Sequence, residues 1–209
     1  MSTVTRQAKN ISKIVVRARH WRRSDDGLQQ RGQNGTDGNG PGPPGNFKYH
    51  SKNCKACQHM SDNLTKYKSS KTGRQYHITR HYTCQSRYIT YLITCRLCRT
   101  QSQYVGQSVQ TMAQRHYGHR SEIKRGEAGL GRHFHDHAVD LGIDLNHANG
   151  VDRITEMLDL VIIGSVEEGK RDSLVRLDRL EEDFQHRLMT MEWQGGINIR
   201  DETKRRRKN

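Results

Sequence analysis

The segment RYITYLIT, residues 87–94, limits the fold more than any other part of the chain. It is rich in β-branched and aromatic residues, which is typical of a buried strand. The segment QYVG, residues 103–106, can pair back on it to complete a hairpin. Cys95 and Cys98 lie between the two strands. A hairpin needs no Cys-x-x-Cys for stability, so this pair indicates a zinc site, an active site, or both side by side.

Three further elements complete the expected fold. LDLVIIGSV, residues 158–166, predicts another strand. A helix is expected over residues 109–125, with Ser108 as its N-cap and Gly126 as its end. Residues 170–191 form a second helical pattern, in which apolar residues recur at spacings of three and four. We therefore expect an α/β fold, with a small mixed or antiparallel three-stranded sheet flanked by helices.

Composition divides the chain into segments. Residues 27–46 hold seven glycines and three prolines, a composition typical of a flexible linker. The expected organisation begins with a basic N-terminal arm (1–26) and this linker (27–46). A Cys/His-rich zinc-binding segment with a small hairpin (47–86) follows, expected as a zinc-knuckle subdomain that precedes the α/β domain (87–200) and a basic tail (201–209).

The charge is unevenly distributed over a chain whose net charge is +14. Residues 47–125 carry 15 Lys and Arg against 2 Asp and Glu, whereas residues 126–203 carry 8 against 17. A basic block that folds into one lobe predicts salt-sensitive binding of phosphates; the alternative is a solvated basic surface. Hydrophobic residues make up only 32% of the chain, and no apolar run suits a membrane span or a signal peptide. We expect an intracellular protein with one small core and no membrane partner.

The five cysteines favour a metal site over a disulfide framework, because their number is odd and two Cys-x-x-Cys pairs are typical of structural zinc. A strand over residues 87–94 would separate Cys84 from Cys95 by more than ~20 Å. Two ligand sets follow from this separation, and free thiols are a third reading. The sets are Cys54, Cys57, Cys95 and Cys98, which we prefer, or Cys54, Cys57 and Cys84 with His77 or His81.

Three residues of the predicted helices are candidates for chemistry. Arg115 and His119 lie one helical turn apart, where an arginine can bind a phosphate and a histidine can accept a proton. The alternative is an exposed basic helix face. Glu181 lies within the apolar stripe of the last helix, where a carboxylate must be paired, protonated or bound to a cation.

These residues occur in the order seen in a known nuclease family. The motifs are Ile89-Thr90-Tyr91, Tyr104-Val105-Gly106, Arg115, Glu181 and Gly196-Ile197-Asn198. Together they resemble the GIY-YIG endonucleases over residues 87–198, about half of the chain. The additional Cys-x-x-Cys pairs, Cys84, the YVGQS turn, HR at 119–120 and HF at 133–134 are similar to the endonuclease domain of Penelope-like retroelements. Ile89-Thr90-Tyr91 departs from the family in lacking its glycine.

The resemblance implies a nuclear DNA endonuclease that hydrolyses phosphodiester bonds with one Mg²⁺ or Mn²⁺ ion, and whose partners are DNA and the reverse transcriptase of the same element. It implies that Glu181 holds the ion and that Arg115 neutralises the phosphate. Tyr91 and Tyr104 would place or deprotonate the attacking water, with His119 relaying the proton. Asn198 would orient a strand end or form a hydrogen bond near the cleft.

Two other interpretations remain open. His133 and His137 are spaced to share a helix face and bind an ion, although we expect them to pack or to line a cleft. The chain is alternatively a noncatalytic, zinc-containing nucleic-acid-binding protein that kept the nuclease fold.

Overall fold

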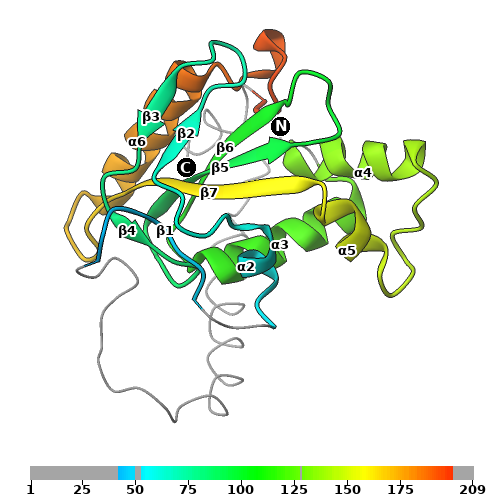
Figure 1. Cartoon of the computed structure of the whole chain (residues 1–209), viewed down its shortest axis with the longest axis horizontal. Coiled ribbons are helices and arrows are strands. Elements are labelled where there is room, and N and C mark those ends of the chain that lie inside the picture. The colour runs from blue at the N-terminus through cyan, green and yellow to red at the C-terminus, as the bar shows by residue number, and fades with distance from the viewer. Residues whose placement is uncertain (1–41, 50–52, 128, 200–209) are drawn as a thin grey trace, which may run out of the picture. The chain divides into compact units, whose positions relative to one another are not determined.

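A three-stranded antiparallel sheet lies at the centre of the fold (Figure 1). Its strands are β5 (Ile89–Cys95), β6 (Gln103–Ser108) and β7 (Leu158–Ser165), in the order β6-β5-β7. The structure is a computed structural model in which residues 42–49, 53–127 and 129–199 are described. The predicted arm, most of the predicted linker and the predicted tail lie outside these residues. All three predicted strands of the sheet are present, so the mixed α/β class is confirmed.

The register of the β5–β6 hairpin brings the two motif tyrosines together. Ile93 pairs with Tyr104, and Tyr91 pairs with Gly106. Tyr91 and Tyr104 therefore project from the same face of the sheet, because residues two apart on a strand point the same way. Their ring centroids are 6.4 Å apart.

The remaining elements surround this sheet. The helices are α2 (Lys55–His59), α3 (Met112–Arg125), α4 (Leu130–Asp140), α5 (Gly150–Thr155), α6 (Ser173–Leu188) and the 3-10 helix η1 (Glu192–Gln194). Two small sheets pair β1 (Gly45–Asn46) with β4 (His81–Tyr82), and β2 (Lys66–Lys68) with β3 (Gln75–His77). None of the helices in the described part of the chain is long and apolar enough to span a membrane.

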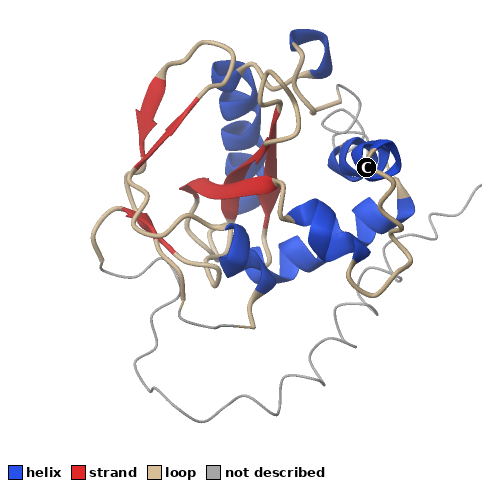
Figure 2. Cartoon of the chain, turned by 45° about the vertical axis from the view of Figure 1, so that its right-hand side comes forward, coloured by secondary structure: helices blue, strands red, loops and turns tan. Residues whose placement is uncertain are grey.

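The helices form two groups. Figure 2 shows α6 running alongside the strands, while α2, α3, α4 and α5 gather as a separate group beside the sheet. Asp152 of α5 joins three members of this group, because its carboxylate lies 2.7 Å from the Arg120 guanidinium of α3 and 3.2 Å from the Lys55 ammonium of α2. Sequence patterns did not predict α4 and α5.

Helix α3 begins later than predicted and ends where predicted. Its N-cap is Thr111, whose hydroxyl accepts the Gln114 backbone N–H at 3.2 Å while the Gln114 side chain accepts the Thr111 N–H. This reciprocal capping box outcompetes the predicted Ser108, whose hydroxyl accepts the Gln110 N–H instead. At the other end, Gly126 caps the helix with φ of 61°, a left-handed conformation that suits glycine.

The predicted linker is too long at its C-terminal end. Asn46 is fully buried and pairs through its side-chain amide with both backbone groups of Ile162, at 2.8 Å each. The segment 47–86 also shares the core of the sheet, since Met60 bridges to Leu160 and Tyr82 is buried. It is therefore part of the same folded unit rather than a separate zinc-knuckle subdomain.

Candidate active site and metal clusters

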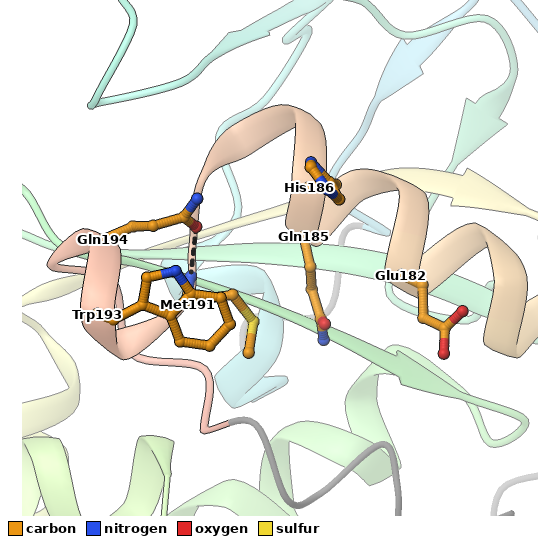
Figure 3. Close-up of a pocket in the computed structure, with 6 residues that line it drawn as sticks. All are labelled: Glu182, Gln185, His186, Met191, Trp193 and Gln194. Carbon is orange, nitrogen blue, oxygen red and sulfur yellow. Dashed lines mark hydrogen bonds between the residues drawn. The ribbon is translucent and has the colours of Figure 1, made fainter.

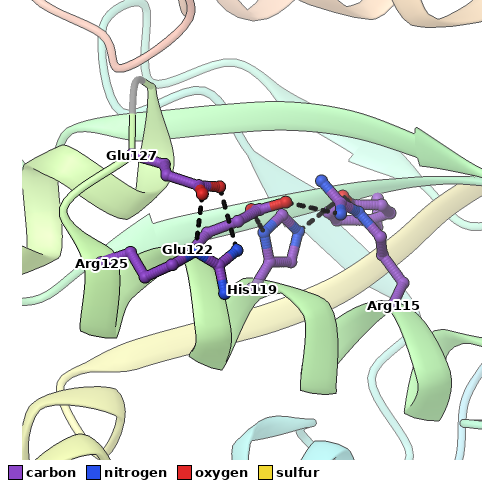
Figure 4. Close-up of polar contacts among 6 residues, drawn as sticks. Arg115, His119, Glu122, Arg125 and Glu127 are labelled. Atoms are coloured by element: carbon purple, nitrogen blue, oxygen red, sulfur yellow. Dashed lines mark hydrogen bonds and ion pairs between the residues drawn. The ribbon is translucent and has the colours of Figure 1, made fainter. Parts of the chain in front are cut away.

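The Tyr91 hydroxyl is the centre of a chain of hydrogen bonds between β5 and α3. It lies 2.7 Å from His119 Nε2 and accepts the Arg115 Nε–H at 3.0 Å. The second ring nitrogen of His119, Nδ1, lies 2.8 Å from a Glu122 carboxylate oxygen, and the other oxygen of Glu122 pairs with Arg115 at 2.9 Å. Figure 4 shows Arg115, His119 and Glu122 side by side along α3, with the separate, exposed Arg125–Glu127 pair beyond them.

Burial sets the protonation states in this chain. Burial and the nearby Arg115 charge lower the pKa of His119 to about 4, so its imidazole is neutral. Burial alone would raise the pKa of Glu122, but its bonds to His119 and Arg115 outweigh this and lower it to about 2. A neutral His119 that donates Nδ1–H to an ionised Glu122 must accept the Tyr91 O–H at Nε2. The Tyr91 proton is thereby directed toward a base.

Arg115 favours the deprotonated, negatively charged form of Tyr91. Burial raises the pKa of Tyr91 to about 12, the positive charge of Arg115 acts against this shift, and the negative charge of Glu181 adds to it. The side chain of Arg115 is 24% exposed and that of Glu122 is 26% exposed, whereas Tyr91 and His119 are almost completely buried. The cluster therefore reaches solvent through Arg115 and Glu122.

Glu181 and Tyr104 complete the group. Glu181 is 5% exposed on α6, as its position in the apolar stripe predicts, and its charge acts on Tyr91. The Tyr104 ring lies edge-on to His119, with centroids 6.0 Å apart. The structure thus brings together Tyr91, Tyr104, Arg115, His119 and Glu181, which the sequence proposed for one site.

Asn198 has a different position from the reacting side chains. Its Nδ2–H donates to the Val105 carbonyl at 2.7 Å, and its Oδ1 accepts the Val105 N–H at 2.9 Å. Asn198 is buried, so both bonds are shielded from water. This contact holds β6 beside Tyr104 and does not place the Asn198 amide among the catalytic candidates.

Glu122 is the member of the site that sequence reasoning missed. The sequence contains a signal that could have identified Glu122, because this residue lies three positions after His119 and seven after Arg115, on the same helix face. A carboxylate next to a histidine fixes which ring nitrogen carries the proton.

The β5–β6 turn contributes to a first metal cluster. Cys95, Cys98, His133 and His137 place their ligand atoms within 4.8 Å of one another. Cys98 Sγ lies 3.4 Å from His133 Nε2 and 3.3 Å from His137 Nε2. Bonds of ~2.3 Å to sulfur and ~2.0 Å to nitrogen at tetrahedral angles put such ligand pairs about 3.5 Å apart, so this set could hold zinc.

A second cluster consists of Cys54, Cys57 and Cys84, whose sulfurs also lie within 4.8 Å of one another. It could hold a metal ion through three thiolates, which suits a soft ion such as zinc. All five cysteines are described, and none forms a disulfide.

These clusters correct two expectations about the ligands. The preferred set of Cys54, Cys57, Cys95 and Cys98 is wrong, because the two Cys-x-x-Cys pairs belong to different clusters. His133 and His137 were expected to pack or line a cleft in preference to binding an ion, yet α4 carries them to the cysteines of the hairpin turn.

The histidine of the alternative set is also not found. Cys84 does join Cys54 and Cys57, but neither His77 nor His81 belongs to the group that the described residues form. His81 stacks on Phe47 at 4.5 Å between ring centroids, and its Nδ1 lies 3.2 Å from the Pro43 carbonyl.

One pocket in the described part of the chain is lined by residues other than Tyr91 and its hydrogen-bond partners. It occupies about 270 Å³ at the C-terminal end of α6 and next to η1 (Figure 3). Its lining residues are Glu182, Gln185, His186, Met191, Trp193 and Gln194. Gln185 stands one helical turn after Glu181, so the pocket adjoins the candidate site along α6.

Comparisons with known proteins do not assign this chain to a class. No family model matches the chain, and neither the curated proteins nor the solved structures include a significant match.

Proposed function

We propose that this protein is a metal-dependent DNA endonuclease of the GIY-YIG type that hydrolyses phosphodiester bonds. The observation that carries the proposal is the hydrogen-bonded chain from Arg115 through Tyr91 and His119 to Glu122, with the buried Glu181 acting on the same tyrosine. This arrangement combines a cation for a phosphate, a base for a proton and a carboxylate for a metal ion.

The proton path follows from the direction of the hydrogen bonds. Water that attacks a phosphodiester must lose a proton, and a tyrosine that has given its own proton to His119 can accept it. Arg115 stabilises the resulting negative charge on the Tyr91 oxygen, and Glu122 stabilises the charge that forms on His119. Tyr104, beside His119, supports the placement of the water.

Glu181 is the proposed metal ligand. A buried carboxylate is costly unless a cation or hydrogen bonds compensate it, and oxygen ligands suit Mg²⁺ or Mn²⁺. A bound divalent ion would supply positive charge opposite the phosphate and the leaving oxygen. Arg115 would add a second positive charge on the side where α3 reaches solvent.

The proposed partners follow from the same assignment. The substrate is DNA, in agreement with the basic charge of residues 47–125. Derivation from a Penelope-like element, a nuclear site of action and a reverse transcriptase of the same element as partner are parts of this proposal.

The test is nicking of supercoiled plasmid with Mg²⁺ or Mn²⁺ by the purified protein. Glu181→Gln, which keeps the side-chain shape, is expected to lower the nicking rate at least about 100-fold while leaving DNA affinity and melting temperature nearly unchanged. Asp183→Ala is the matched control, because Asp183 is a partly exposed carboxylate of the same helix whose ion pair among the described residues is with Arg187. No nicking by the wild-type protein with either ion would overturn the proposal.

The noncatalytic nucleic-acid-binding protein is the second candidate. It is favoured by the near-complete burial of Tyr91 and His119, since a reacting group must be reached by its substrate. The same assay separates the two candidates, because this one predicts DNA binding by the wild-type protein without cleavage.

A further inference from the structure

The hairpin formed by β2 and β3 is fixed beside the candidate site. Ser69 Oγ donates to the Leu188 carbonyl at 3.0 Å, and the Tyr76 hydroxyl donates to the Arg187 carbonyl at 3.3 Å. The Gln103 amide donates to the Lys68 carbonyl at 2.9 Å. The hairpin is thus joined to α6, which carries Glu181, and to β6, which carries Tyr104.

The outward side of this hairpin is basic. Lys66, Lys68 and Arg74 are exposed, and Lys71 is half-buried at the turn. Among the described residues, none of these four cations makes an ion pair. The sequence from 63 to 121 holds ten Lys and Arg and no Asp or Glu. Cations left without acidic partners on a rigid hairpin suit a polyanion.

The hairpin turn reaches Gly195, the residue that follows the pocket residue Gln194. A Cβ built on Gly195 would lie 2.6 Å from Lys71 Nζ, so the ammonium rests against the residue that ends η1. Trp193, two positions earlier, is 63% exposed and lines the pocket together with Met191 (Figure 3). A cation therefore lies beside Gly195, close in sequence to Trp193, whose accessible ring lines the pocket.

The pocket suits a nucleobase better than a phosphate. Its volume of about 270 Å³ lies just below the ~300–1,000 Å³ of pockets for drug-sized ligands. The aromatic and thioether walls can stack on a flat ring, while Gln185 and Glu182 provide polar groups for its edge. The Glu182 carboxylate would repel a phosphate inside the pocket, which leaves the phosphate to Lys71 beside Gly195.

We propose that the Trp193 pocket and the β2–β3 turn bind a single strand of nucleic acid, with one base against Trp193 and the backbone on Lys71. Bases in a duplex are paired and stacked, so their faces cannot reach such a pocket unless the strand opens. Aromatic platforms beside a cationic track are the usual means of holding single strands. This inference deepens the proposed function, because it assigns an unpaired strand to the surface that adjoins Glu181.

The test is fluorescence anisotropy without added Mg²⁺, using one labelled oligonucleotide as a single strand and in a duplex. Trp193→Ala is expected to weaken single-strand binding about 5- to 100-fold and duplex binding less than about twofold, whereas Trp193→Phe keeps most of the affinity. Lys71→Gln is expected to weaken binding to both probes and to reduce the salt slope for the single strand by about 0.7.

Two controls make the result specific. Lys124→Gln removes an exposed cation at the far end of α3 and is expected to leave the preference for the single strand unchanged. Oligonucleotides that carry one abasic position in turn locate the base in the pocket. At that position the wild-type protein should lose as much affinity as Trp193→Ala loses on the intact strand, and the variant should lose nothing more.

The outcomes separate this inference from the nuclease assignment. Equal losses for single strand and duplex in Trp193→Ala, or no sensitive abasic position, would overturn the strand-binding surface even if plasmid nicking is normal. Conversely, a wild-type protein that prefers single strands through Trp193 but nicks no plasmid would keep this surface and overturn the endonuclease.

Discussion

At the scale of single residues, the Tyr91 hydroxyl is the atom on which the candidate site depends. It joins Arg115 to His119, and both bonds need the ring to stay within a few tenths of an ångström of its position. Gly106, opposite Tyr91 on β6, leaves the space for this ring, because a Cβ there would lie 2.6 Å from the Tyr91 hydroxyl oxygen.

Gly106→Ala is therefore expected to displace Tyr91 and Tyr104, since the added Cβ would also come within 2.7 Å of the Tyr104 ring. We expect plasmid nicking to fall at least about tenfold, because small misplacements of catalytic groups cost large factors in rate. Gly142→Ala is the control. Gly142 has a φ of +64° with no atom within 4 Å of a built Cβ, so it should lose stability but keep nicking. Equal nicking rates for both variants would contradict this role of Gly106.

At the scale of elements, the two clusters of possible metal ligands join parts of the chain that are distant in the sequence. The first cluster connects the β5–β6 turn to α4, and the second connects α2 to the segment before β5. Short elements such as the five-residue α2 are unstable alone, so a metal that binds both parts would stabilise them.

Cys98→Ser is expected to remove about one zinc per chain and to lower the melting temperature by about 10 °C, which corresponds to about 3 kcal/mol for a chain of this size. Bound metal is measured by mass spectrometry of the purified protein. Cys54→Ser should remove metal from the other cluster only, and the double variant should lose both. Complete loss of zinc in Cys98→Ser alone would contradict two separate clusters and restore a single four-cysteine site.

At the scale of the whole molecule, buried neutral histidines tie stability to pH. Burial and the charge of Arg115 lower the pKa of His119 to about 4, and burial, with the nearby His59, His119 and Arg120, lowers that of His116 well below its ordinary value of 6.5. His116 is fully buried, and its ring is tilted against that of His59, with ring centroids 5.0 Å apart. The unfolded chain therefore binds more protons than the folded protein between pH 6.5 and 4.

The sign of this linkage gives a prediction. The stability contributed by these histidines is complete above about pH 6.5 and is lost as the pH falls, by up to about 1.4 kcal/mol per pH unit for each histidine. Urea unfolding at pH 7.5, 6 and 5 measures this slope. His116→Phe should reduce the pH dependence of the unfolding free energy by up to the contribution of one histidine. The variant and the wild-type protein are compared at the same zinc content, so that the effect of protons on the metal clusters cancels. Identical slopes would contradict a neutral, buried His116.

The elements with strong local patterns are those that the sequence predicted. The β5–β6 hairpin and β7 follow from short runs rich in β-branched, aromatic and aliphatic residues, and α6 follows from apolar residues at spacings of three and four. The burial of Glu181 follows from its place in the pattern of α6. The start of α3 was predicted three residues early, because Ser108 and Thr111 are both good caps and only the Gln114 side chain decides between them. Helices α4 and α5 lacked a pattern strong enough to predict.

The sequence by itself determined the α/β class, the strands of the central sheet and most members of the candidate site, because these depend on residue types a few positions apart. Only the tertiary structure decided which cysteines share a cluster, that His133 and His137 join Cys95 and Cys98, and that the turn carrying Lys71 lies beside Gly195. These contacts join residues 30 to more than 100 positions apart. They depend on how the elements pack against one another, which no local pattern specifies.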